Sequence, residues 1–335
     1  MARRDRPRVE RRRGSDRLRR RVPTLQLDQS SDARIPDRGL LTFPGVATVT
    51  QAIVVIPARN EAALLPAALA SLRQEGLAAL VVANGCTDAT AALARAAGVD
   101  VIETPALDGG VGAARAIGLA AAMDRGAEIL FTVDADCRLA PGTAATVRRA
   151  LGQADAVFGR VVPNAADFAL LPAEVRRHGL AEDRRDGLRA LIASAAAARL
   201  WDPFPAHAQS PGALIAWRVT AYRATGGIAR VACHEDRQMA ATLAVQGLRV
   251  ARPWGAVTIA SCRLTGRAPG GMADTIAQRT RLGARLVREA ADLERECAEL
   301  EQRLSAFIPR ADWPDLPTLS TEGDENVSSF QQATV

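Results

Sequence analysis

Residues 52–61 read Ala-Ile-Val-Val-Ile-Pro-Ala-Arg-Asn-Glu, an apolar run that ends at Pro57 and passes into polar residues. A continuous β-branched run of this length, closed by a proline, is typical of a strand that is buried on both faces. Residues 61–74 then carry apolar side chains at helical spacing. The stretch therefore predicts a strand followed directly by a helix.

The same alternation continues through the next part of the chain. Strands are predicted at 79–83, 99–102 and 128–133, with helices between them at 88–97 and 111–125. Strands that alternate with helices build a parallel sheet that is covered by helices on both faces. The sequence therefore predicts the α/β class with a mostly parallel sheet.

The second half of the chain is less regular. A helix is expected at 188–200, where Asp202 and Pro203 stop it. The other predicted elements are strands at 156–161, 210–217, 248–251 and 257–260 and helices at 218–225 and 235–246. Residues 274–307 combine helical periodicity with many charges, which predicts a solvated helix and is compatible with a homodimer interface.

The positive charge of the chain is concentrated at its start. All 43 basic residues are arginine and the net charge is +6, yet residues 1–22 alone hold eleven arginines against three acidic residues. Residues 1–48 lack a sustained period and are predicted to be a disordered tail. A basic arm of this kind also suits the anionic face of a membrane, whereas a nucleic-acid partner is not favoured.

Neither a secretory signal nor a membrane-spanning segment is predicted. Polar residues, not an apolar segment, follow the arginine run, and no window reaches the length of a membrane span. The five cysteines are scattered without metal or disulfide spacing, as expected of reduced thiols. These observations predict a cytoplasmic protein, with peripheral contact at the inner face of the membrane left open.

Asp134 and Asp136 directly follow the strand predicted at 128–133. The carboxyl ends of parallel strands are where such sheets bind ligands. Two carboxylates spaced two residues apart across a turn can share a divalent cation, which would neutralise a diphosphate. Taken alone, an acidic turn explains this DxD motif equally well, because Asp is common in turns.

Three other polar segments stand where predicted strands end or a predicted helix begins. These are Pro57-Ala58-Arg59-Asn60-Glu61, Asn84-Gly85-Cys86-Thr87-Asp88 and His234-Glu235-Asp236. With the DxD motif and in this order, they make residues 51–252 resemble the soluble, bacterial-type family 2 glycosyltransferases. The resemblance implies a GT-A-like nucleotide-diphospho-sugar transferase sandwich and an inverting transfer of sugar to an acceptor hydroxyl.

The resemblance also implies roles for the matched residues. Asp136 would be the main ligand of Mn²⁺ or Mg²⁺, with Asp134 beside it. Asp236 would be the general base, and Glu235 would orient the acceptor or hold a neighbouring cation. The implied donor-binding residues are Pro57, Arg59, Glu61, Asn84, Asp88, Gly112, Arg115 and Asp134.

These patterns divide the chain into regions. Residues 49–265 are predicted to be the GT-A domain, with a nucleotide-binding half at 49–150 and an acceptor half at 151–265. A C-terminal helical segment would occupy 266–308 and a tail 309–335.

Two further segments offer candidate contacts. The loop 261–271 carries Arg263 and Arg267, which would suit a donor phosphate, although a flexible connection explains the loop equally well. Trp201, Trp217 and Trp254 fall near the expected acceptor side, where aromatic faces bind sugars, although core packing is the simpler interpretation.

Several alternatives remain open at this stage. Ala83 and Ala116 stand where many family members have an acidic residue and an asparagine, so the donor base stays undefined. A small molecule, a lipid-linked sugar and a polysaccharide unit are all compatible acceptors. A sugar-nucleotide nucleotidyltransferase and a non-catalytic nucleotide-sugar-binding protein are the alternative functions. A nicotinamide dehydrogenase is disfavoured, because no GxGxxG follows the first strand.

Overall fold

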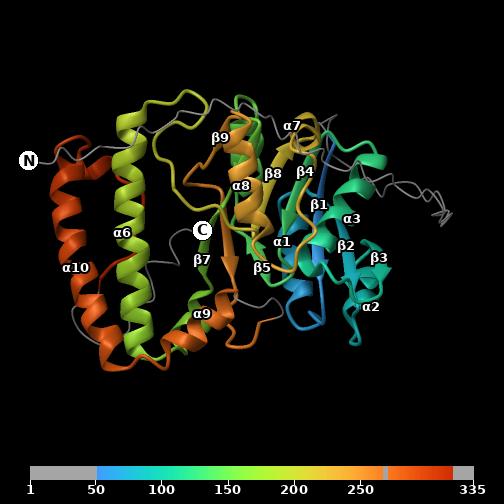
Figure 1. The fold of residues 1–335 in the computed structure, drawn as a ribbon, viewed down its shortest axis with the longest axis horizontal. Coiled ribbons are helices and arrows are strands. Elements are labelled where there is room, and N and C mark those ends of the chain that lie inside the picture. Colours follow the sequence, from blue (N-terminus) through green and yellow to red (C-terminus); the bar gives the residue numbers. More distant parts are fainter. Residues whose placement is uncertain (1–50, 267–270, 320–335) are drawn as a thin grey trace, which may run out of the picture. The chain divides into compact units, whose positions relative to one another are not determined.

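The computed structural model describes residues 51–266 and 271–319 (Figure 1). The arginine-rich arm at 1–48, with the membrane contact considered for it, lies outside the described residues, as do Arg267 and the last part of the C-terminal tail. None of the described helices combines the length and the apolar character needed to cross a bilayer.

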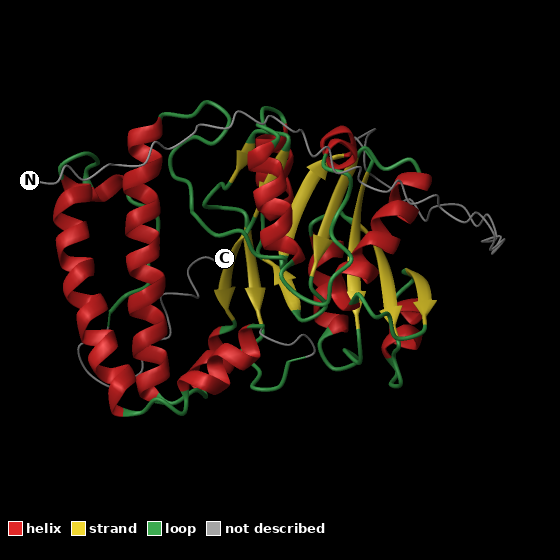
Figure 2. Cartoon of the chain, viewed as in Figure 1, coloured by secondary structure: helices red, strands yellow, loops and turns green. Residues whose placement is uncertain are grey.

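A seven-stranded sheet organises the described residues (Figure 2). Its strand order is β3-β2-β1-β4-β8-β6-β9. Within this sheet, β8 alone runs antiparallel to its neighbours. The strands are β1 (Ala52–Ala58), β2 (Ala78–Asn84), β3 (Asp100–Thr104), β4 (Ile129–Val133), β6 (Ala156–Phe158), β8 (Leu214–Arg218) and β9 (Val250–Ala251). The predicted α/β class with a mostly parallel sheet is confirmed.

A three-stranded sheet stands beside it, in the order β5-β10-β7. Its strands are β5 (Cys137–Leu139), β7 (Arg160–Pro163) and β10 (Val257–Ala260). β5 follows the DxD turn, and β7 continues the chain beyond β6. The small sheet therefore extends the edge at which the predicted metal ligands lie.

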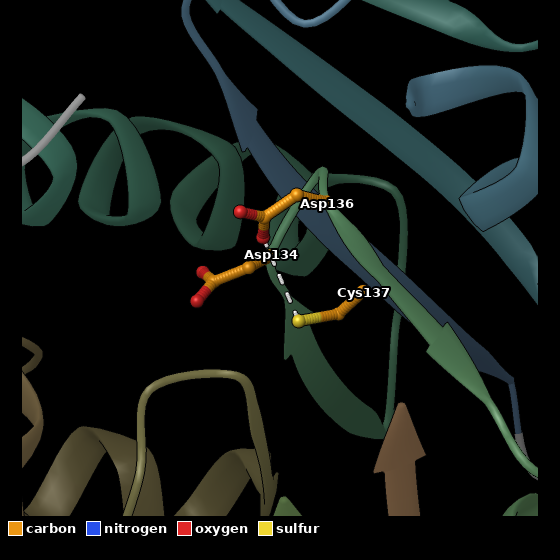
Figure 3. Close-up of side chains that lie close together, drawn as sticks. All are labelled: Asp134, Asp136 and Cys137. Atoms are coloured by element: carbon orange, nitrogen blue, oxygen red, sulfur yellow. Dashed lines mark hydrogen bonds between the residues drawn. The ribbon is translucent and has the colours of Figure 1, made fainter. Parts of the chain in front are cut away.

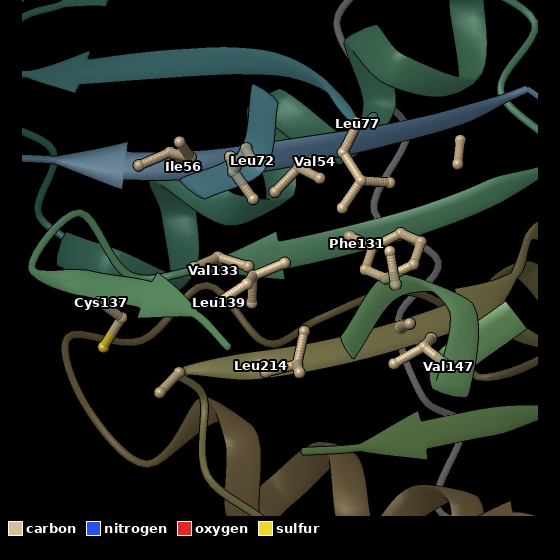
Figure 4. Packing of buried hydrophobic residues seen from close by; sticks show 14 of the residues in the cluster. Val54, Ile56, Leu72, Leu77, Phe131, Val133, Cys137, Leu139, Val147 and Leu214 are labelled. Carbon is tan, nitrogen blue, oxygen red and sulfur yellow. The ribbon is translucent and has the colours of Figure 1, made fainter. Parts of the chain in front are cut away.

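Helices cover both faces of the large sheet, as predicted. On β1, Val54 and Ile56 point into one buried cluster (Figure 4). Ile53 and Val55 point into the other, as the two-residue period of a strand requires. The first cluster takes side chains from α1 (Leu65–Gln74), α2 (Thr90–Ala96) and α4 (Thr143–Leu151). The second takes side chains from α3 (Gly110–Asp124), α7 (Val219–Ala224) and α8 (Glu235–Val245).

One glycine sets how closely α3 approaches the sheet. A Cβ added to Gly118 would lie 2.3 Å from Cγ1 of Val55. A larger residue would therefore force α3 away from β1, because the contact is far shorter than van der Waals distance.

The helix predicted at 188–200 is longer and begins earlier. α6 spans Ala173–Ala197. Its first half carries many charged residues, with Val175, His178 and Ala181 as its buried positions. The apolar periodicity is too weak there to reveal the helix, and its stability comes from packing instead. A short helix, α5 (Ala165–Ala169), precedes it.

The predicted continuous helix at 274–307 is two helices. α9 (Met272–Arg279) and α10 (Ala284–Ser305) are separated by a turn in which Gly283 has a φ of 48°. α10 lies beside α6 of the same chain, with Leu300 and Leu304 in one buried cluster with Leu188 and Leu191 (Figure 1). The apolar stripe of α10 is therefore covered within the chain.

Charges on the same two helices also pair. Nη2 of Arg177 lies 2.6 Å from Oε2 of Glu294, and Nη2 of Arg184 lies 2.6 Å from Oε1 of Glu301. The chain after α10 forms a 3₁₀ turn at Arg310–Asp312. Residues 308–319, which include the start of the predicted tail, contribute side chains to the α6–α10 cluster.

Candidate active site

The predicted donor and metal residues gather at one edge of the large sheet. Pro57 pairs with Val82 across β1 and β2, and Val55 pairs with Thr132 across β1 and β4. Since these strands are parallel and in this register, their carboxyl ends lie side by side. The segments 59–61, 84–88 and 134–136 therefore meet at this edge, as the sequence predicted.

Arg115 connects this edge to the start of α8. Its guanidinium donates to the carboxylates of Asp134 and Glu235, and Nη2 also donates to the carbonyl oxygen of Gly212 at 3.0 Å. The Arg115 side chain is 2% exposed. A buried guanidinium is stabilised by opposite charges, and here two carboxylates from distant parts of the chain provide them. Its Nε has no hydrogen-bond partner among the described residues.

The two acids at the start of α8 have different environments. Glu235 is buried against Arg115, whereas Asp236 is half-exposed. Oδ2 of Asp236 accepts a hydrogen bond from the backbone N–H of Gly212 at 2.8 Å. Asp236 is therefore the accessible acid of the pair, and its carboxylate is held in one orientation.

Asp136 lies against a guanidinium that the sequence had associated with phosphate. Arg263 donates to both carboxylate oxygens of Glu61, each at 2.7 Å, and its Nη2 is 2.9 Å from Oδ2 of Asp136. Burial and the neighbouring Asp134 raise the pKa of Asp136 to about 6, although Arg263 acts in the opposite direction. Arg263 thus provides a positive charge where the sequence predicted a metal ion.

Asp134, Asp136 and Cys137 form a cluster whose ligand atoms all lie within 4.8 Å of one another (Figure 3). The Cys137 thiol donates to Oδ1 of Asp136 at 3.6 Å, and burial holds its pKa well above the ordinary value. The raised pKa favours the protonated thiol, which donates to Asp136. The remaining donors are carboxylate oxygens, which fit Mg²⁺ or Mn²⁺.

Asn84 binds the backbone at the start of α3. Its side-chain oxygen accepts from Leu107 N at 2.9 Å, and its amide nitrogen donates to Gly110 O at 3.2 Å. These bonds hold the start of α3 against β2. A contact of the same side chain with a nucleotide base would replace one of these bonds.

Gly112 contacts protein backbone where a ligand contact was predicted. Its N–H donates to Val231 O at 3.1 Å, and an added Cβ would lie 2.2 Å from Ala229 O. The glycine allows the start of α3 to pack against residues 229–231. It therefore helps to place the segment that leads into α8.

Asn60, which was not among the predicted site residues, joins two loops at this edge of the sheet. Its Oδ1 accepts from Thr87 N at 2.8 Å, and its φ is 55°. Asp88, close by, accepts hydrogen bonds from Ala62 N at 3.1 Å and from Thr90 N at 3.0 Å. Pro57 is buried in β1 and Arg59 is exposed at the edge. The preference of Asn for left-handed backbone was the available signal for Asn60.

The sequence of this edge matches a known family. Residues 53–194 match glycosyl transferase family 2. The resemblance predicted from the motifs is confirmed over this stretch, which runs from β1 into α6 and includes both carboxylates of the DxD motif. Glu235, Asp236 and Arg263 lie beyond it.

Three solved structures illustrate what this chain is similar to. The mannosyltransferase PcManGT of Pyrobaculum calidifontis, in complex with GDP-Man and Mn²⁺, is 19% identical, with 78% of this chain and 82% of that chain covered and a TM-score of 0.43. S. aureus TarS 1–349, in complex with UDP-GlcNAc, is 14% identical, with 78% of this chain and 74% of that chain covered and a TM-score of 0.48.

The third is glucosyl-3-phosphoglycerate synthase from Mycobacterium tuberculosis, in complex with Mn²⁺, uridine diphosphate and phosphoglyceric acid. It is 19% identical, with 70% of this chain and 78% of that chain covered and a TM-score of 0.44. Because these TM-scores are below 0.5, the likeness to glycosyl transferase family 2 rests on the match over residues 53–194. No curated protein matches this sequence.

Proposed function

We propose that this chain is an inverting glycosyltransferase that moves a sugar from a nucleotide-diphosphate donor to an acceptor hydroxyl. The observation that carries the proposal is the double ion pair of Arg115 with Asp134 and Glu235. It joins the DxD turn, inside the family match, to the Glu-Asp pair of α8, outside it. The donor would occupy the edge formed by residues 49–150, and the acceptor would approach from residues 151–265.

Asp136 and Asp134 would hold the divalent cation through carboxylate oxygens. When bound, that ion would neutralise the donor diphosphate and stabilise the leaving phosphate. Arg263 contacts the same carboxylate of Asp136. It therefore maintains a positive charge beside Asp136 and Glu61 and prevents an uncompensated cluster of acids.

Asp236 would act as the general base. Its carboxylate is accessible, and the Gly212 N–H fixes its orientation. It would take the proton from the acceptor hydroxyl while the acceptor oxygen bonds to the anomeric carbon and the bond from that carbon to the phosphate oxygen breaks. One displacement of this kind inverts the anomeric centre. Glu235 is engaged by Arg115 and would position α8.

Calorimetry with UDP-, GDP- and dTDP-sugars, with and without Mn²⁺ or Mg²⁺, tests the proposal. We expect metal-dependent binding of one donor class, loss of binding in Asp136→Ala, and retention in Asp236→Asn. Asp236→Asn should nevertheless lose the release of nucleoside diphosphate. The absence of binding with every donor would contradict the donor assignment, and undiminished turnover in Asp236→Asn would contradict the assignment of the base.

A further inference from the structure

A cavity of about 350 Å³ lies beside α6, apart from the residues assigned to the donor. Its walls come from β7, the middle of α6, the loop before β8, Trp254 and the chain near Leu316. The volume falls in the lower part of the range of small-molecule sites, which is about 300 to 1,000 Å³. No residue of the proposed donor site or metal site lines it.

Several polar groups in the wall lack partners among the described residues. Asp183 is half-buried, and no hydrogen bond or ion pair joins its carboxylate to a described residue, although the positive charge of Arg160 acts on it. The buried Nε of Arg160 and the buried Nε1 of Trp254 are likewise unpartnered. Trp254 is 8% exposed. The two nitrogen atoms have almost no accessible surface, so a ligand in the cavity would contact the Asp183 carboxylate and not these two groups.

Gln209 adds another donor to the cavity. Its Oε1 accepts from Val161 N at 2.8 Å, which fixes the amide and leaves the NH₂ group for a further partner. His207, which also lines the cavity, is fully engaged, with Nε2 at 3.2 Å from Phe158 O and Nδ1 accepting from Gln209 N at 3.1 Å. Gln209, and not His207, is therefore the group of this loop that is available to a ligand.

The charges of the wall balance. Asp183 and Asp186 stand against Arg160 and Arg189, and two of these four groups are already paired, Asp186 with Arg185 and Arg189 with Glu296. A phosphate site would instead carry a clear excess of positive charge. The ring of Trp254 in this wall is buried, and the guanidinium carbon of Arg160 lies 4.6 Å from its centroid and covers one face. Balanced polar groups suit a neutral polyhydroxylated ligand, because hydroxyl groups both donate and accept hydrogen bonds.

A short segment joins the cavity wall to the residue that orients the proposed base. Gln209 is three residues before Gly212, which donates to Asp236, so the Cα atoms of Gln209 and Gly212 are at most about 11 Å apart. Arg252 fixes the intervening loop through Gln209 O at 3.2 Å and Ser210 Oγ at 2.9 Å. This connection places the cavity on the side of the chain from which the acceptor is proposed to approach.

We propose that this cavity binds a neutral sugar unit of the acceptor. Asp183 accepts hydrogen bonds from its hydroxyl groups, and the amide NH₂ group of Gln209 donates to them. This inference rests on the proposed function and deepens it, because it makes the acceptor a sugar and not a phosphorylated metabolite. The donor edge and this cavity are then two separate binding sites of one enzyme.

Two matched pairs of variants test the cavity. Asp183→Asn removes the unpaired carboxylate, whereas Asp186→Asn changes the same residue type on the same helix, where Arg185 already engages it. Ala193→Phe places a ring into the cavity from an exposed position, and Ala196→Phe is its control on an exposed part of α6 that does not line the cavity.

The probes are the methyl glycosides of glucose, galactose, mannose and N-acetylglucosamine, with binding measured by saturation-transfer NMR and calorimetry in the absence of nucleotide. We expect millimolar binding of at least one glycoside, at least fivefold weaker in Asp183→Asn and abolished in Ala193→Phe. Asp186→Asn and Ala196→Phe should stay within twofold of the unmodified protein. Donor binding, measured on the same preparations, should persist in all four variants and shows that they are folded.

The proposal is overturned if none of these glycosides binds while the donor does, or if each control weakens binding as much as its partner. Loss of donor binding in the unmodified protein would instead contradict the proposed function. The two failures are therefore distinguishable.

Discussion

The donor edge and the cavity beside α6 differ in how closely their carboxylates are paired with arginine. At the edge, Asp134 has Arg115 and Asp136 has Arg263. In the cavity, Asp183 has no ion pair with a described residue, although the charges of Arg160 and Arg279 act on it. An edge that gathers several carboxylates needs compensating charge inside the protein, because adjacent buried acids destabilise one another. Burial and the neighbouring Glu182 and Asp186 raise the pKa of Asp183 to about 7, while Arg160 and Arg279 act in the opposite direction. The Asp183 carboxylate has no hydrogen bond to a described residue and is available for a neutral ligand.

The largest expected effect is on the buried ion pairs of the donor edge. Arg115→Met should lower the free energy of unfolding by about 3–5 kcal/mol, because it leaves two carboxylates without their partner. Urea unfolding measures the change. Arg177→Met is the control, since its pair with Glu294 is largely exposed and should contribute about 0–1 kcal/mol. Equal losses in the two variants would contradict the difference drawn between buried and exposed pairs.

The cavity wall should make stability depend on pH through His207. Burial, with Arg160 and Arg252 nearby, lowers the pKa of this residue from 6.5 to about 3. The unfolded chain therefore binds a proton that the folded chain does not, and stability is lost as the pH falls through 6.5. Between pH 7 and pH 5 the His207 contribution should fall by about 2 kcal/mol.

His207→Gln should remove this part of the pH dependence, even if the variant is less stable at pH 7. The comparison has to be made between the two proteins, because Asp136 and Asp183 have raised pKa values that act in the opposite direction. Thermal and urea unfolding at pH 5, 6 and 7 supply the slopes. Identical slopes would show that His207 is not held neutral in the folded protein.

A smaller effect is expected on cation binding. Arg263→Gln should tighten the binding of Mn²⁺ about tenfold, or about 1.4 kcal/mol, because the guanidinium contacts the carboxylate that the ion would use. Calorimetry without nucleotide measures the affinity. Arg59→Gln, an exposed arginine at the same edge, is the control for a general loss of positive charge. Weaker binding in Arg263→Gln would mean that Arg263 organises the site and does not compete with the ion.

The sequence predicted the donor edge better than the second half for a physical reason. Each predicted polar segment of the donor edge follows a strongly apolar strand, such as Ala52–Ala58. Parallel topology brings the ends of these strands together. The pairing of Arg115 with Glu235 could not be predicted, because the two residues are 120 positions apart and local spacing does not encode their contact. Asn60 was missed because its role depends on one backbone angle.

The cavity could not be predicted from local patterns. Its walls combine β7, the middle of α6 and the loop before β8, and α6 itself extends well beyond its apolar second half. Trp254 was predicted to lie near the acceptor side, but the environment of its indole N–H depends on residues that are distant in the sequence. The position of Arg263 likewise depends on how its loop folds back onto Glu61.

Time-resolved ¹H NMR of donor hydrolysis tests the central claim most directly. With the donor that calorimetry identifies, an α-linked sugar should be released first as the β-anomer, because one displacement inverts the anomeric centre. Asp236→Asn should bind the donor and release almost none of the sugar. Initial release of the α-anomer, or undiminished release by Asp236→Asn, would contradict an inverting transferase that uses Asp236 as its base.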